Sequence, residues 1–165
     1  MRSSRAIRLL VLDVDGVLTD GRLYFGPRGE ALKAFDVRDG AGIVQLRGAG
    51  VEVAVISGRR SPMVAARCRE LGVRHLYQGV GDKLAVFRRL CARLGVAPAV
   101  CACVGDDVAD VPLMRSVALS FAVADAHPTA RRAARVVTRG GGGAGAVREV
   151  CDLLLARQAR RGRQR

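Results

Sequence analysis

Short apolar runs alternate along this chain with longer segments whose apolar residues recur every three or four positions. The short runs have the length of buried strands, and the longer segments have the period of amphipathic helices. The predicted strands are residues 7–12, 51–56, 74–77, 100–104, 117–123 and 136–137. The predicted helices are residues 39–47, 61–71, 82–94, 110–114, 129–134 and 146–155. This alternation predicts an α/β fold, with a Rossmann-like parallel sheet that carries helices on both faces.

Residues that typically begin and end helices support these assignments. Ser61 precedes Pro62, a pair typical of an N-cap followed by the first helical position. Asp82 is expected to cap the next helix, and Gly95 stands just past the last apolar residue of that helix, Leu94. We therefore expect helices to start after Ser61 and Asp82.

The segment 17–36 interrupts the alternation. Two stretches, RLYF and EALKAF, flank Gly26-Pro27-Arg28-Gly29, which has the composition of a tight turn. This pattern predicts a β-hairpin that projects from the sheet. Because each other interval is filled by one strand and one helix, the hairpin is the insertion, and it is too small to form a separate cap domain.

Length and composition limit the class of protein. At 165 residues the chain can form one complete core, and we expect a single domain over residues 1–158. Residues 159–165 are polar and basic, as in a disordered tail. No apolar run approaches the ~20 residues of a membrane span, and the basic start leads into a strand pattern, so we expect a soluble, cytoplasmic protein. Five cysteines lie in apolar patterns without metal-ligand spacing and are expected to be reduced core residues.

The formal net charge of +13 raises the question of nucleic-acid binding. The basic residues are 26 arginines and two lysines, and outside the stretch from Arg157 to Arg165 they are scattered rather than arranged in a stripe. Such scatter favours a solvated basic surface. Nucleic acid is therefore not expected as the main partner.

Residues with the chemistry of phosphoryl transfer stand at or just beyond four predicted strand ends. Asp13 can attack phosphorus to form an aspartyl phosphate, and Asp15 can act first as general acid and then as general base. Asp13 and Asp106, with a backbone carbonyl near Asp15, offer the hard oxygen ligands that Mg²⁺ prefers. Ser57 can donate a hydrogen bond to a phosphate oxygen, and Lys83 can pair with Asp13 and with phosphate.

Each of these signals alone has an ordinary structural explanation. Two aspartates after a strand are common in turns, and a Ser-Gly pair is common between a strand and a helix. Asp106, Asp107 and Asp110 could simply cap the next helix. The four signals in order favour a phosphoryl-transfer site, because the carboxyl ends of parallel strands meet at one edge of a sheet.

The same residues carry a family resemblance. DVDGV, ISGR, Lys83 and GDDVAD resemble the four motifs of haloacid dehalogenase-like phosphatases. From residue 7 to about residue 155, the chain also resembles the small phosphatases of that family that hydrolyse 3-deoxy-D-manno-octulosonate 8-phosphate on the way to lipopolysaccharide. The segments that carry this likeness are LTDGRLYF, FDVRDGAGI, HLYQGV, AVADAHP and GAVREVCDLLL. The resemblance implies a Mg²⁺-dependent phosphomonoesterase that acts on a phosphorylated sugar acid.

The resemblance also implies roles for single residues. It makes Asp13 the nucleophile and Asp15 the acid and base, and it assigns Mg²⁺ to Asp13, Asp106 and the carbonyl of Asp15. Ser57 and Lys83 would hold the phosphate. The implied contacts to substrate are Asp15, Asp36, Val37, Arg38, Asp39, Gly40, Arg59, Arg67 and Lys83. Arginines suit the carboxylate of the sugar acid.

A homotetramer is implied as well, in which hairpins associate and a neighbouring subunit helps to close each site. Leu23, Tyr24 and Phe25 fit burial in such an interface, and they fit packing on their own domain nearly as well. One position departs from the pattern of the family. Ala144 stands where an arginine is expected in a GGRGAVRE-like segment, and this departure bears on how the substrate is held.

Two alternatives stay open. Phosphatases for nine-carbon, sialic-acid-like 9-phosphates share this fold and these motifs, but they often carry an acidic residue after the second-motif Ser or Thr, where this chain has Gly58-Arg59. The other alternative is a non-catalytic assembly or nucleic-acid-binding module of the same fold. The intact set of motif residues argues against that alternative.

Overall fold

Six parallel strands form the central sheet of the computed structural model, which describes residues 6–162. The strands lie in the order β5-β4-β1-β6-β7-β8. Their bounds are β1 (Leu9–Leu12), β4 (Glu52–Ile56), β5 (His75–Tyr77), β6 (Cys101–Gly105), β7 (Leu119–Ala122) and β8 (Val136–Val137). All pairings within this sheet are parallel, so the predicted α/β class is confirmed.

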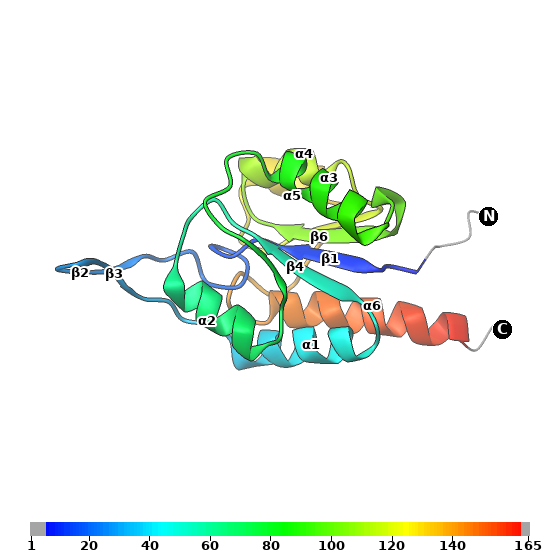
Figure 1. Cartoon of the computed structure of the whole chain (residues 1–165), viewed down its shortest axis with the longest axis horizontal. Helices are drawn as coiled ribbons and strands as arrows, with labels where there is room; N and C mark the ends of the chain where they lie inside the picture. The colour runs from blue at the N-terminus through cyan, green and yellow to red at the C-terminus, as the bar shows by residue number, and fades with distance from the viewer. Residues whose placement is uncertain (1–5, 163–165) are drawn as a thin grey trace.

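Helices cover both faces of the sheet (Figure 1). One face carries α1 (Val37–Gly48), α2 (Pro62–Glu70) and α6 (Ala146–Gly162), and the other carries α3 (Lys83–Leu94), α4 (Val111–Met114) and α5 (Pro128–Ala133). Two short 3₁₀ helices, η1 (Pro98–Val100) and η2 (Val108–Asp110), flank β6. Because both faces are covered, the strands are largely apolar, and all four residues of β1 are buried.

The predicted helix caps are confirmed at α3 and differ in detail at α2. The Asp82 side chain accepts a hydrogen bond from the Ala85 amide at 3.0 Å, and Gly95 ends α3 in the left-handed region with φ of 61°. Ser61 holds the N-cap position of α2, but its hydroxyl makes no capping bond. Its own amide donates to Gln78 Oε1 at 2.8 Å instead.

The predicted hairpin is present as β2 (Tyr24–Gly26) and β3 (Gly29–Leu32), and it projects from one end of the domain (Figure 1). Pro27 and Arg28 form the turn, and Gly29 follows with φ of 105°, a value that favours glycine. Phe25 is 67% exposed, and the other large apolar side chains of this segment that reach the surface are Leu23, Tyr24 and Leu32.

The C-terminal helix is longer than the sequence pattern predicts. The apolar period predicts a helix to Leu155 and disorder from residue 159, whereas α6 continues to Gly162. Residues 159–162 thus belong to the helix in this structure, since alanine and arginine are good helix formers even without an apolar face. Residues 163–165, the remainder of the predicted tail, lie outside the described residues.

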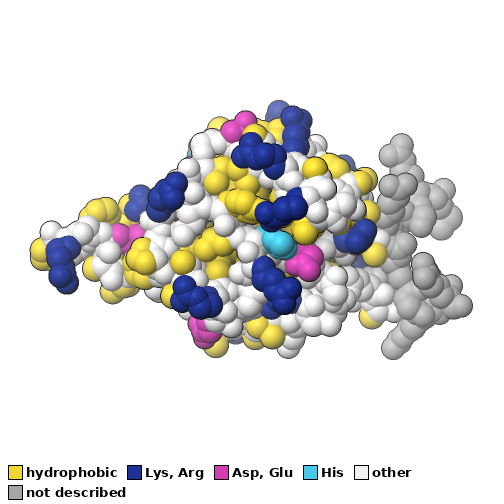
Figure 2. All heavy atoms as spheres, in the orientation of Figure 1, with side chains coloured by type: hydrophobic (Ala, Val, Ile, Leu, Met, Phe, Trp, Pro, Cys, Tyr) yellow, Lys and Arg dark blue, Asp and Glu magenta, His cyan; other side chains and the backbone are white. Residues whose placement is uncertain are grey.

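Surface and core agree with the compositional expectations. On the face drawn in Figure 2, lysine and arginine side chains are scattered among other types and form no stripe. All five cysteines are free and buried. Within residues 6–162, no helix has the length and apolar character needed to cross a membrane.

Candidate active site

The register of the sheet brings the predicted motif residues to one edge. Leu12, the last residue of β1, pairs with Val55 of β4 and with Val104 of β6. Asp13 therefore stands level with the ends of both neighbours, and Ser57 and Asp106 follow within two residues. The direction in which successive strands are added reverses at β1, since β4 and β5 lie on one side of it and β6 to β8 lie on the other. Such a reversal of strand order is where open α/β sheets bind ligands.

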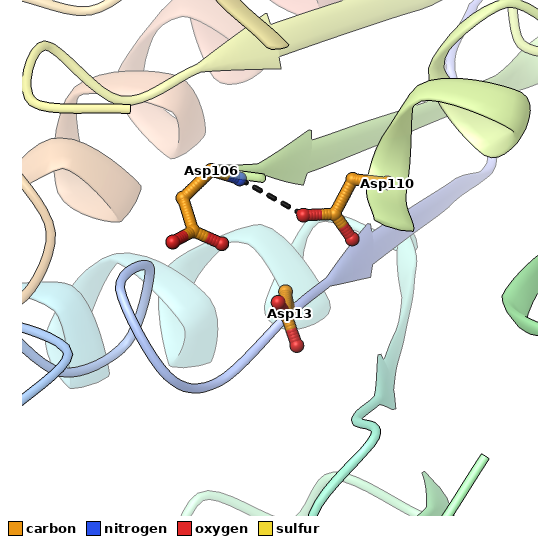
Figure 3. Close-up of side chains that lie close together, drawn as sticks. All are labelled: Asp13, Asp106 and Asp110. Carbon is orange, nitrogen blue, oxygen red and sulfur yellow. Dashed lines mark hydrogen bonds between the residues drawn. The ribbon is translucent and has the colours of Figure 1, made fainter. Parts of the chain in front are cut away.

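Three carboxylates and one ammonium group form an acid cluster, which we define as Asp13, Asp106, Asp110 and Lys83. One oxygen from each aspartate lies within 4.8 Å of the others (Figure 3). Lys83 Nζ lies 2.8 Å from Asp13 Oδ2 and 2.7 Å from Asp110 Oδ1, and its side chain is 8% exposed. With every member ionised, three negative charges and one positive charge give the acid cluster a net charge of −2.

Both carboxylate oxygens of Asp110 are engaged in hydrogen bonds within the cluster. Its Oδ2 accepts hydrogen bonds from the amides of Asp106 at 2.9 Å and Asp107 at 3.2 Å, while its Oδ1 accepts from Lys83. The Asp106 carboxylate, in contrast, lies against Gly16, whose φ is 84°. A Cβ at Gly16 would overlap that carboxylate, so the turn after Asp15 requires glycine.

The ionisation of the acid cluster reflects its excess negative charge. Burial and the charge of Asp110 raise the pKa of Asp13 to about 6, although Lys83 opposes the shift. Burial and the charge of Asp13 raise the pKa of Asp106 to about 8. Burial alone would lower the pKa of Lys83, but Asp13 and Asp110 outweigh it and raise that pKa, so Lys83 stays cationic.

These residues fit a bound Mg²⁺ ion. Hard carboxylate oxygens are its preferred protein ligands, and a second cation would offset the net charge that raises both pKa values. Asp106 is the ligand whose carboxylate makes no hydrogen bond to a described residue, whereas Asp13 Oδ1 accepts from the Val14 amide at 2.7 Å and Asp13 Oδ2 pairs with Lys83. Asp13 and Asp106, which the sequence predicts as metal ligands, both lie in this cluster, and Asp110 is not among the predicted ligands.

A second charged group lies beside the first and involves the hairpin. We define this hairpin cluster as Asp15, Glu30, Lys33 and Arg59. Lys33 Nζ donates a hydrogen bond to Asp15 Oδ1 and pairs with Glu30 Oε1 at 2.9 Å. Arg59 lies 3.8 Å from Asp15 Oδ2 and 3.7 Å from Glu30 Oε1. Two negative and two positive charges balance in this cluster.

The remaining predicted residues differ in how far their side chains are exposed to solvent. Ser57 is buried at the end of β4, where its Oγ accepts a hydrogen bond from the Arg59 amide at 3.3 Å. Asp36 caps α1 and pairs with Arg38 at 2.6 Å, which lowers the pKa of Asp36. Both Arg38 and Val37 reach the surface.

Asp39 and Gly40, predicted to contact substrate, are used in packing in this structure. Asp39 is 1% exposed, and its Oδ1 accepts a hydrogen bond from the Arg148 amide at 2.8 Å, in the first turn of α6. Gly40 is covered by the guanidinium of Arg67, which also pairs with Glu70 at 2.8 Å. Arg67 is thus partly held by its own helix.

Sequence reasoning missed three members of the two clusters. Asp110 was treated as a helix cap, although it is the last acid of the GDDVAD segment. Glu30 and Lys33 lie in the hairpin, where charged residues are ordinary. The one available signal was that Lys33 is one of only two lysines in an arginine-rich chain, and that the other is Lys83.

Comparison with known proteins agrees with this geometry. A family model described as haloacid dehalogenase-like hydrolase matches residues 31–117. The 3-deoxy-D-manno-octulosonate 8-phosphate phosphatase KdsC of Escherichia coli K12 is 56% identical over 154 residues, which cover 93% of this chain and 82% of that protein. Its counterpart from Yersinia pestis is a solved structure with a TM-score of 0.91 and 53% identity, covering 93% of this chain and 83% of that one.

A further solved structure is informative about ligands. The 3-deoxy-D-manno-octulosonate 8-phosphate phosphatase of Moraxella catarrhalis, in complex with a magnesium ion, a phosphate ion and KDO, has a TM-score of 0.89 and 40% identity. The match covers 91% of this chain and 86% of that one. Sequence, fold and site geometry agree, and the chain belongs to the haloacid dehalogenase-like hydrolase family.

Proposed function

We propose that this protein is a Mg²⁺-dependent phosphatase that hydrolyses 3-deoxy-D-manno-octulosonate 8-phosphate to the free sugar acid and phosphate, in lipopolysaccharide biosynthesis. The observation that carries the proposal is the acid cluster, in which Asp13 at the end of β1 contacts Lys83 and lies beside Asp106. The names of two relatives that are 56% and 53% identical to this chain support the choice of substrate, as do the ligands of a third that is 40% identical.

We assign the two chemical steps of the reaction to Asp13 and Asp15. An Asp13 oxygen attacks phosphorus, so that the Asp13 O–P bond forms while the bond from phosphorus to the sugar oxygen breaks. Asp15 delivers a proton to that leaving oxygen. Water then attacks the aspartyl phosphate, Asp15 takes the proton from water, and Asp13 is regenerated as phosphate leaves.

The remaining residues bind and orient the phosphate. When bound, Mg²⁺ supplies a positive charge that stabilises the phosphate oxygens and offsets the carboxylates. Lys83 holds Asp13 at the end of β1 and contributes a second positive charge, and Ser57 donates a hydrogen bond to a phosphate oxygen. Among the predicted substrate contacts, Arg38 and Arg59 have exposed guanidinium groups and are the ones we assign to the sugar-acid carboxylate.

Phosphate release from a panel of sugar phosphates, with and without Mg²⁺, tests this proposal. The wild-type protein should prefer the eight-carbon octulosonate phosphate, and Asp13→Asn should lose activity by about three orders of magnitude or more. Asp152→Asn, an exposed change on α6, serves as the control. Undiminished activity in Asp13→Asn or in chelator would overturn the mechanism, and preference for a nine-carbon 9-phosphate would overturn the substrate.

We further propose that the protein acts as a cytoplasmic homotetramer associated through its hairpins. The exposed apolar side chains of the hairpin, Phe25 above all, support an interface there. Free, buried cysteines fit a reducing compartment. A solution mass near 17.5 kDa at working concentration would contradict the tetramer.

A further inference from the structure

Lys33 stands at the base of the projecting hairpin, where its side chain is covered although the residue as a whole is only partly buried. Its side chain is 1% exposed, while its neighbour Leu32 is 48% exposed. Lysine is almost never fully buried unless it is paired, because removing an ammonium group from water costs several kcal/mol. The two carboxylates that pair with it are Asp15 and Glu30. The burial of Lys33 therefore depends on the residue that we propose as the general acid and base.

The contacts of Asp15 are unequal at its two oxygens. Oδ1 accepts the hydrogen bond from Lys33, whereas Oδ2 faces Arg59 at 3.8 Å, beyond hydrogen-bond distance. The terminal torsion of an aspartate has a broad energy minimum, so a carboxylate held at one oxygen rotates far less than a free one. The contact with Lys33 thus leaves the other oxygen of Asp15 in a fixed place and without a hydrogen bond to any described residue.

Glu30 holds Lys33 in place. It lies on β3, three residues before Lys33, and its side chain is 11% exposed. Because Glu30 pairs with Lys33 at 2.9 Å and approaches Arg59 at 3.7 Å, both cations are kept beside Asp15. The hairpin contributes Glu30 and Lys33, and the loops that follow β1 and β4 contribute Asp15 and Arg59. Ion pairs therefore join the hairpin to the loops that carry Asp15 and Arg59.

We propose that Lys33 is the positioning residue of Asp15, and that it orients the free oxygen of Asp15 toward the oxygen that leaves phosphorus. This inference rests on the proposed phosphatase function and gives the hairpin a task in proton transfer in addition to assembly. Proton transfer requires the donor within hydrogen-bond reach of the acceptor, so a freely rotating Asp15 transfers its proton less often. Displacement of the hairpin would release Asp15 and slow the reaction.

Leaving-group dependence tests this proposal. Lys33→Met should lower kcat for the octulosonate phosphate by about 10- to 100-fold, with KM changed less than about twofold. In a series of aryl phosphates, the loss of kcat/KM should shrink as the phenol becomes more acidic, because an acidic phenol leaves without a proton. Lys33→Arg should retain most of the wild-type dependence, and Glu30→Gln should show the same trend as Lys33→Met to a smaller extent. Arg28→Met, in the hairpin turn, is the matched control.

Other results would overturn the proposal in distinct ways. An equal loss on all aryl phosphates, with a lower melting temperature, would mean that Lys33 only holds the hairpin. A higher KM with unchanged kcat would mean that Lys33 binds substrate. If the wild-type protein hydrolyses none of these phosphates, the proposed function fails and this inference fails with it. Asp13→Asn should abolish activity on the whole series and so separates failure of the nucleophile from failure of positioning.

Discussion

The acid cluster and the hairpin cluster lie side by side, yet their charges are arranged in opposite ways. The acid cluster joins three aspartates to Lys83, with a net charge of −2. The hairpin cluster joins two carboxylates to Lys33 and Arg59, with a net charge of zero. A group with excess negative charge attracts a further cation. In a group whose positive and negative charges are equal, the ion pairs neutralise one another and hold the side chains in place.

The two clusters also differ in what carries them. Asp13 and Asp106 follow the two central strands of the sheet, whose residues are fully buried. Glu30 and Lys33 belong to a hairpin whose outer side chains are exposed. The difference indicates a division of labour, in which the rigid core fixes the nucleophile and the metal ligands, and a more exposed element orients the acid.

Removing the cation of the acid cluster should have the largest effect. Lys83→Met leaves three carboxylates without their partner in a buried site, so we expect a stability loss of about 3–5 kcal/mol and a fall in activity of about 100-fold or more. Urea unfolding and phosphate release measure these changes. Near-wild-type stability would show that the carboxylates are better solvated than their burial indicates.

Magnesium affinity should depend on pH. Because the metal-free pKa of Asp13 is about 6 and that of Asp106 about 8, Mg²⁺ must displace protons from these groups at neutral pH. We expect the apparent Kd to rise about tenfold for each unit that the pH falls between 8 and 6. Calorimetry in two buffers of different ionisation enthalpy measures the released protons. A Kd that does not change with pH would contradict the raised pKa values of Asp13 and Asp106.

Neutralising Asp106 should stabilise the metal-free fold. Its raised pKa means that the folded protein keeps a proton which the unfolded chain loses above 3.8, so metal-free stability falls as the pH rises from 3.8 to about 8. Asp106→Asn cannot ionise and should melt at a higher temperature than wild type above pH 8. Addition of Mg²⁺ should raise the melting temperature of wild type only. Thermal scans with and without chelator compare the two proteins.

The smallest effect is expected in the balanced cluster. Glu30→Gln leaves Lys33 with Asp15 as its partner and keeps an oxygen that can accept from Lys33, so we expect a loss in unfolding free energy of about 1–2 kcal/mol. Urea unfolding of this variant beside Lys83→Met gives the direct contrast. A loss as large as that of Lys83→Met would end the distinction between the two clusters.

The site could be predicted from the sequence only as far as its motif residues. Asp13, Asp106 and Lys83 each follow a recognisable apolar strand or begin a recognisable helix, and parallel strands place such ends at one edge. The pairing of Lys33 with Asp15 had no such signal, because the two residues are 18 positions apart and the hairpin lies between them. Asp39 resembled a site residue in sequence, yet it bonds an amide 109 residues away.

The sequence by itself determined the order of strands and helices, the hairpin insertion and the four motif positions, because apolar periodicity and capping residues act over a few neighbouring residues. Only the tertiary structure decided which charges meet. It placed Asp110 between Lys83 and the Asp106 loop, turned Asp39 into the core and brought Lys33 onto Asp15. Such contacts depend on strand order and on the packing of distant segments, and they leave no local pattern in the chain.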